Sequence, residues 1–195
     1  MLIANRKPLV AISFDTVTYR DLKLWLEKFH GTELLRVEPN QQHLQFSPEY
    51  QYINLVIKDF VLRQEITEFL DREKLDRFSF VHPMTSVDIE IDPIGVMVGP
   101  LVAIYSNCKV GSDMIVQTLS VLGHDTCIGK GSYISPNVVV AGTARIGEYC
   151  FIGFGSGIFE NITIASNVVL GAHALVRHSI DSPGVYFSPH VLQKI

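Results

Sequence analysis

A histidine and an aspartate stand side by side at His124-Asp125. An imidazole changes its protonation near neutral pH, so it can accept a proton from an attacking amine or hydroxyl group. A neighbouring carboxylate can fix the tautomer of the ring or favour its protonated form. The pair therefore indicates general-base chemistry, in which the imidazole takes the proton of an attacking amine or hydroxyl group. The residues alone also allow a histidine that lies on the surface of a strand without a catalytic role.

The pair lies in a stretch that repeats every six residues. Large aliphatic residues occupy positions 98, 104, 110, 116, 122, 128, 134, 140, 146, 152, 158, 164, 170 and 176, all of them Val, Ile or Leu. Mostly small residues follow four positions later, and glycine directly follows the aliphatic residue at 99, 111, 123, 129, 147, 153 and 171. A helix repeats every 3.6 residues and a flat strand every two, so neither explains this period.

Hexapeptide repeats are typical of a parallel β-helix, in which each hexad forms one side of a triangular coil. The aliphatic residue is expected to point into the narrow core, and so is the small residue four positions later. Glycine is expected beside the corner, where backbone freedom and close approach are needed. Cys108 and Cys150 fall in the small inward column and are predicted to be packed thiols, whereas Cys127 is expected to point outward.

The composition is that of a globular chain. It has 195 residues, 47% of them hydrophobic, and its mean hydropathy is +0.24. The net charge of −4 gives no general attraction to nucleic acid. We find no apolar run long enough to cross a membrane and no secretory signal at the start, so we expect a cytoplasmic protein. Three cysteines are too few for a disulfide framework.

The chain divides into two parts, a small α/β domain over residues 1–81 and the coil over residues 82–195. In the first part, strands and helices alternate, which predicts a parallel sheet. Strands are expected at 8–14, 33–37, 52–57 and 77–81, with helices at 19–29 and 60–75. Gly31 is expected to end the first helix.

This order of domains resembles the bacterial sugar acyltransferases that include the N-acetyltransferase of bacillosamine synthesis and the sialic acid O-acetyltransferases. The resemblance rests on Leu122–Gly129 (LGHDTCIG), on Ala141-Gly142 and on Ile146–Gly153 (IGEYCFIG). It implies a mainly β fold with a left-handed parallel β-helix and a small N-terminal α/β domain that binds the acceptor. It also implies a homotrimer that uses acetyl-CoA and no metal, and that acylates a sugar or nucleotide sugar in surface-polysaccharide or glycan biosynthesis.

The resemblance assigns roles to individual residues. His124 becomes the general base with Asp125 beside it, and a backbone N–H near Gly142 stabilises the thioester oxyanion. Five residues are implied to contact acyl-CoA: Ala141, Gly142, Tyr133, Phe154 and Ala172. Three are implied to contact the acceptor: Ser13, Thr16 and Lys58. The chain also departs from the family: among other differences, residues 12–18 contain no glycine, and Tyr133 stands where some members have a second histidine.

Two other functions remain open. One is a non-catalytic trimeric scaffold, which the missing Gly-rich turn would suit. The other is a metal enzyme similar to the γ-class carbonic anhydrases, because His173 and His178 are five residues apart, a spacing which those enzymes use. His124 cannot complete that site within one chain, because three coils of about 4.8 Å each separate it from His178.

Overall fold

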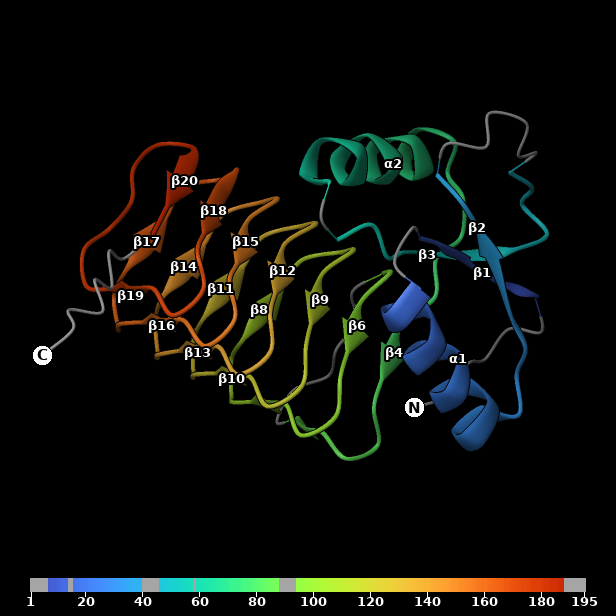
Figure 1. Ribbon diagram of the computed structural model, residues 1–195, viewed down its shortest axis with the longest axis horizontal. Helices are drawn as coiled ribbons and strands as arrows, with labels where there is room; N and C mark the ends of the chain where they lie inside the picture. Colours follow the sequence, from blue (N-terminus) through green and yellow to red (C-terminus); the bar gives the residue numbers. More distant parts are fainter. Residues whose placement is uncertain (1–6, 14–15, 40–45, 58, 88–93, 188–195) are drawn as a thin grey trace, which may run out of the picture.

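The computed structural model describes residues 7–13, 16–39, 46–57, 59–87 and 94–187. Two parts are visible in Figure 1: a long coil of short strands, and a small α/β domain at the end where the coil begins. Neither described helix has the length and hydrophobicity needed to span a bilayer.

The α/β domain is built on a parallel sheet in the order β2-β1-β3. Its strands are β1 (Leu9–Ile12), β2 (Leu34–Val37) and β3 (Gln51–Asn54), and its helices are α1 (Thr16–His30) and α2 (Phe60–Arg72). Alternate residues of β1 point to opposite faces: Leu9 packs with the α1 residues Leu22 and Leu26, whereas Val10 packs with the α2 side. Gly31 ends α1 with a φ of 61°, as predicted.

The coil has three parallel faces, each formed by strands that stack with a spacing of one turn. The seven-stranded face contains β4 (Phe80–Val81), β6 (Met97–Val98), β9 (Ile115–Val116), β12 (Tyr133–Ile134), β15 (Phe151–Ile152), β18 (Val168–Leu170) and β20 (Gly184–Tyr186). The six-stranded face contains β5 (Ser86–Val87), β7 (Ala103–Ile104), β10 (Val121–Leu122), β13 (Val139–Val140), β16 (Gly157–Ile158) and β19 (Leu175–Val176). The four-stranded face contains β8 (Lys109–Val110), β11 (Cys127–Ile128), β14 (Arg145–Ile146) and β17 (Thr163–Ile164).

The predicted inward register is confirmed. The aliphatic column lies in one buried core together with the small column. Serines of the small column link successive turns: Ser120 Oγ donates to Ser135 O and accepts from Val138 N, and Ser132 and Ser156 repeat the pattern. Both inward cysteines are buried, as predicted, and they donate to the equivalent carbonyl groups.

The corners correct one expectation. Glycine directly after the aliphatic residue is needed for close approach only: a Cβ added to Gly123 would lie 2.6 Å from Gly142 N on the next turn. The left-handed backbone conformation lies two residues later. There, φ is positive at Asn107, Asp125, Thr143 and their equivalents, and most of these residues are not glycine. The corner therefore tolerates a side chain where the chain turns and excludes one where adjacent turns touch.

The α/β domain docks on the seven-stranded face. Side chains from its α1 side form one core with the coil residues Met97, Ile115 and Tyr133. Arg63 of α2 is buried and donates to Gly131 O at 2.8 Å and to Asp113 O, which both belong to coil corners. The two parts therefore share buried contacts.

The expected last strand at 77–81 is divided between the two parts. Arg77 forms a bridge with Tyr52 in the α/β domain, whereas Phe80–Val81 already pair with β6 of the coil. The chain thus enters the coil at β4 because the aromatic ring of Phe80 is buried in the core that both parts share.

Candidate active site

His124 lies on the turn between the six-stranded and four-stranded faces, which we call the His124 corner. Its Nδ1 is 2.8 Å from Asp125 Oδ2. Because the carboxylate accepts, Nδ1 carries the proton and Nε2 keeps a lone pair that can accept another.

Asp125 is held from several sides. Its backbone has a φ of 58°, its N–H donates to Ser106 O at 3.0 Å, and Asn107 Nδ2 donates to its Oδ1 at 3.2 Å. The hydrogen bonds from His124 and Asn107 hold the pKa of this carboxyl below its usual value. Asp125 therefore stays ionised and orients the imidazole at neutral pH.

Gly142 lies directly beneath the imidazole on the next turn. Thr143 N donates to His124 O at 2.8 Å, which sets the two turns in register. A Cβ added at Gly142 would stand 2.5 Å from His124 Nε2 and 2.7 Å from Cε1. The ring can occupy its present position only because residue 142 has no side chain.

The backbone N–H of Gly142 forms no hydrogen bond with any residue that the structure describes. The N–H groups on either side are both used, since Ala141 N donates to Ile158 O and Thr143 N to His124 O. A free donor beside a proton acceptor is the arrangement that stabilises a developing oxyanion during acyl transfer.

On the outside of the His124 corner, two aromatic residues flank a stretch without large side chains. In steps of 18 residues along the corner, Tyr105 and Phe159 stand on either side of two small residues, Gly123 and Ala141. The two aromatic residues are 54% and 46% exposed. Arg177 continues the column, with its guanidinium 5.5 Å from the centre of the Phe159 ring.

The other residues predicted to contact acyl-CoA lie elsewhere on the chain. Phe154 and Ala172 are on the turns between the seven-stranded and six-stranded faces, and Phe154 meets His173 edge to face at 5.0 Å. Tyr133 lies on the seven-stranded face, where it is buried and stacks on Phe151 at 5.3 Å. Of the five residues predicted to contact acyl-CoA, Ala141 and Gly142 are the two that lie next to His124 within one chain.

Two of the residues predicted to contact the acceptor, Ser13 and Thr16, belong to the α/β domain and not to the His124 corner. Ser13 is buried at the carboxyl end of β1, where its N–H donates to Val37 O at 3.0 Å. Thr16 begins α1, and Lys58 lies outside the described residues. The roles of all three stay predictions.

The predicted alternative ligands of a metal also occupy different corners. His178 follows Arg177 on the His124 corner, whereas His173 is on the turn that carries Phe154. Across the part of the chain that the structure describes, no three His, Cys, Asp or Glu side chains gather as metal ligands would. Cys127 is partly exposed, as expected, and accepts from Arg145 Nη1 at 3.4 Å.

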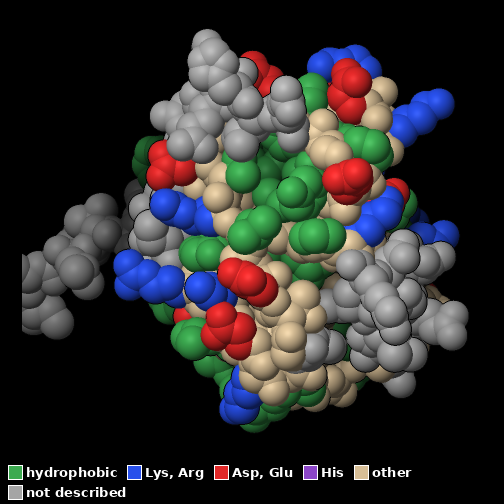
Figure 2. All heavy atoms as spheres, turned by 90° about the vertical axis from the view of Figure 1, so that its right-hand side faces the viewer, with side chains coloured by type: hydrophobic (Ala, Val, Ile, Leu, Met, Phe, Trp, Pro, Cys, Tyr) green, Lys and Arg blue, Asp and Glu red, His purple; other side chains and the backbone are tan. Residues whose placement is uncertain are grey.

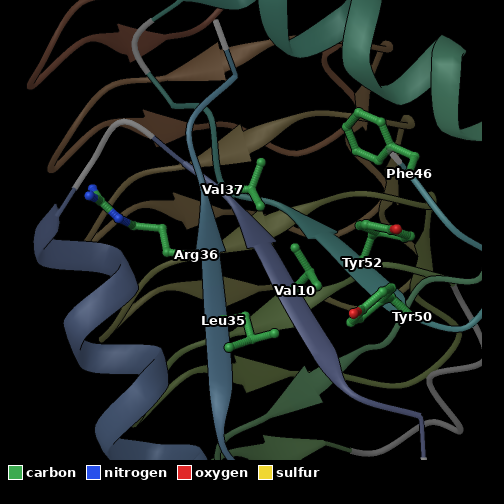
Figure 3. Close-up of a pocket in the computed structure, with 7 residues that line it drawn as sticks. All are labelled: Val10, Leu35, Arg36, Val37, Phe46, Tyr50 and Tyr52. Carbon is green, nitrogen blue, oxygen red and sulfur yellow. The ribbon is translucent and has the colours of Figure 1, made fainter. Parts of the chain in front are cut away.

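A separate cavity of about 310 Å³ lies in the α/β domain. Figure 2 shows hydrophobic side chains gathered in the middle of the molecule's end that carries this domain. Figure 3 shows the cavity on the face of the sheet, with Val10, Leu35, Val37 and the rings of Phe46, Tyr50 and Tyr52 around it. None of these residues was predicted from the sequence to bind a substrate, and none lies on the His124 corner.

Asn107, Tyr105 and Phe159 are residues of this corner that the sequence analysis missed. The signal was present in the sequence, because Asn107 precedes Asp125 by one turn of 18 residues and Tyr105 precedes Gly123 by the same spacing. Steps of six define the core, whereas steps of 18 define what lies together on one outer corner.

Comparisons with known proteins agree with this fold. The family model for the bacterial transferase hexapeptide (six repeats) matches residues 125–160. No curated protein matches the sequence. The acetyltransferase domain of PglB from Neisseria gonorrhoeae FA1090 superimposes with a TM-score of 0.82, at 21% identity over 95% of this chain and 98% of that chain.

Two further solved structures have the same arrangement. WeeI from Acinetobacter baumannii AYE gives a TM-score of 0.77, at 16% identity over 94% of this chain and 98% of that chain. PerB from Caulobacter crescentus gives 0.63, at 18% identity over 94% of this chain and 95% of that chain. The expected hexapeptide fold, a left-handed parallel β-helix with a small N-terminal α/β domain, is confirmed.

Proposed function

We propose that this chain is an acyltransferase that moves an acetyl group from acetyl-CoA to an amino or hydroxyl group of a sugar or nucleotide sugar. One observation carries the proposal: the His124–Asp125 pair is seated over Gly142, whose N–H is free among the described residues. The candidate general base and the candidate oxyanion donor thus lie side by side on an exposed corner of the coil.

The reaction follows from this arrangement. His124 Nε2 takes the proton of the acceptor as its nitrogen or oxygen attacks the thioester carbon, while Asp125 keeps the proton on Nδ1. The N–H of Gly142 donates to the oxyanion that forms. The tetrahedral intermediate then expels the CoA thiolate, which takes the proton from the imidazolium. No bond forms between the acyl group and the protein.

The comparisons support the choice of substrates. The PglB domain was solved in complex with acetyl coenzyme A, and PerB in complex with CoA and GDP-perosamine. Both proteins share this chain's fold over nearly its whole length. We therefore assign acetyl-CoA as donor and a sugar or nucleotide-sugar acceptor, in a pathway of surface-polysaccharide or glycan assembly. Because acetyl-CoA is a cytoplasmic metabolite, we also place the reaction in the cytoplasm.

A homotrimer would complete the site. Within one chain the α/β domain docks on the seven-stranded face, which does not include the His124 corner. Exposed apolar residues mark a different surface, with Val139 and Leu175 on the six-stranded face and Leu101, Leu119 and Phe154 on the adjoining turns. Packing this surface against a neighbour would bring Phe154 and Ala172 of one chain toward His124 of another. Sedimentation equilibrium should give the mass of three chains, and a monomer would contradict this assembly.

Titration calorimetry with acetyl-CoA tests the function. We expect one binding site per chain, followed by acceptor-dependent release of thiol when amino- or hydroxy-sugars are added. Failure to bind acetyl-CoA or free CoA at millimolar ligand would refute the proposal.

A further inference from the structure

Tyr105 is an exposed aromatic side chain at the edge of the candidate active site. It is 54% exposed, its ring makes no aromatic contact and its hydroxyl forms no hydrogen bond with any residue that the structure describes. Single exposed apolar residues are common on proteins and need no explanation by themselves. The position of Tyr105 beside the candidate active site, however, does need an explanation.

The hydrogen bonds between turns place Tyr105 next to the catalytic pair. Tyr105 N donates to Leu122 O at 3.0 Å, and Asp125 N donates to Ser106 O at 3.0 Å. Tyr105 is thus in register with Gly123, one turn of about 4.8 Å away. Because Gly123 has no side chain, residue 123 places no side chain between the phenol ring of Tyr105 and the turn that carries His124.

The two ends of the row that runs from Tyr105 through Gly123, Ala141 and Phe159 to Arg177 differ in chemistry. Beyond Ala141, toward the end of the coil, Phe159 lies beneath the Arg177 guanidinium, and a fixed positive charge suits the phosphates of a CoA molecule. Tyr105 follows β7 at the opposite end of the row, on the side where the coil begins and where the α/β domain packs on Met97 and Ile115. In a trimer with its axis along the coils, every α/β domain is at that same end, so an acceptor held by one arrives past Tyr105.

We propose that Tyr105 packs its ring against the sugar ring of the acceptor and so selects and positions that substrate. The inference rests on the proposed function. The apolar C–H face of a pyranose can cover an aromatic ring, while a phenol keeps its polar tip in water. Tyr105 has the exposed ring that this contact needs. A sugar stacked on that ring would lie one turn of the coil from His124, whose Nε2 would accept the proton of the reacting group.

Steady-state kinetics of Tyr105→Ala, Tyr105→Phe and Phe159→Ala tests the inference. The assay measures thiol release from acetyl-CoA with a panel of nucleotide-linked amino-hexoses, GDP-perosamine included. Tyr105→Ala should raise the KM for the best acceptor about tenfold or more and leave the KM for acetyl-CoA within about twofold. Tyr105→Phe keeps the ring and should stay close to the parent. Phe159→Ala, three turns of the coil away from Tyr105, should leave the acceptor KM unchanged.

The outcomes separate this inference from the proposed function. A parent protein that binds no acetyl-CoA and releases no thiol with any acceptor overturns both. An active parent with an unchanged acceptor KM in Tyr105→Ala overturns the role of Tyr105 alone. An equal rise in the KM values for acceptor and acetyl-CoA also overturns that role. A Tyr105→Phe variant as impaired as Tyr105→Ala does so too, because stacking requires only the ring.

Discussion

At the scale of single residues, the position of the imidazole depends on a glycine in the adjacent turn. His124 Nε2 stands 2.5 Å from where a Cβ of residue 142 would be. Gly142→Ala should therefore push the ring away from its place while the coil remains folded, since the imidazole is exposed and can rotate. A displacement of this size is expected to lower turnover on the order of 10²-fold.

The measurement for Gly142→Ala is the rate of thiol release, with a melting curve to check the fold. Gly157→Ala is the matched control, because its Cβ would meet only the flexible end of Leu175, at 3.1 Å. Full activity in Gly142→Ala would mean that the imidazole does not act from this position.

A second residue-scale feature is a buried carboxyl at the domain junction. Asp113 is fully buried and paired with Arg77 Nη1 at 2.6 Å, and its other oxygen has no partner among the described residues. Burial, which outweighs the attraction of Arg77 and Arg63, raises its pKa to about 6. The folded protein therefore binds more protons than the unfolded chain between about pH 4 and 6, so Asp113's contribution to stability declines as pH rises through this range.

Asp113→Asn removes this titration. In the parent, the contribution of Asp113 to the free energy of unfolding should fall by on the order of 3 kcal/mol from pH 4 to pH 6. The variant should lack that decline. Unfolding free energies from urea titrations at several pH values give the difference between the two proteins. Parallel pH profiles for parent and variant would show that Asp113 does not titrate in this range.

At the scale of elements, the six-residue repeat decides which residues are inside the coil. Val140 is completely buried, whereas its neighbour Val139 is 47% exposed on the same strand. Val140→Asp places an unpaired charge in a core with no room for water and should unfold the coil. Val139→Asp adds the same charge outside and should leave the coil of each chain folded. Far-UV circular dichroism melts distinguish them, and a Val140→Asp melt like the parent's would refute the register.

Much of this element-scale structure could be predicted from the sequence. The aliphatic column fixes the strands because each inward position recurs after one side of the triangle, and helix α1 shows its buried Leu22 and Leu26 at helical spacing. The left-handed corner residues were not predicted. Asn, Asp and Thr at those positions give no uniform signal, since the conformation is imposed by the turn and several residue types tolerate it.

At the scale of the whole molecule, one arginine joins the two parts. Arg63 of α2 is 1% exposed. Its guanidinium donates to Asn54 O and Val56 O in the α/β domain and to Gly131 O and Asp113 O in the coil. Arg63→Leu would leave these buried carbonyls without donors and should cost about 3–5 kcal/mol of unfolding free energy.

The matched control for Arg63→Leu is Arg72→Leu on the same helix, because Arg72 is exposed and, among the described residues, pairs with Glu73 and lies over the ring of Phe69. Limited proteolysis should release the α/β domain of Arg63→Leu faster than that of the control. Equal stability of the two variants would show that Arg63 does not hold the domains together.

This junction could not be predicted from the sequence. Arg63 belongs to a helix whose charged residues mostly face water, and Asp113 falls at an ordinary corner position of the repeat. Their burial results from the way in which the α/β domain docks on the coil, a contact between residues 50 or more positions apart. The proximity of His124, Asp125 and Gly142 could be predicted, because His124 and Asp125 are adjacent in sequence and Gly142 lies one turn away.

The most direct test of the account is turnover and acetyl-CoA binding measured together in parent and His124→Ala. With His124 as the general base, thiol release should fall by on the order of 10²–10⁴-fold, while calorimetry should still find one acetyl-CoA site per chain, because the histidine acts on the acceptor's proton. A His124→Ala variant with the parent's rate of thiol release would contradict the central claim.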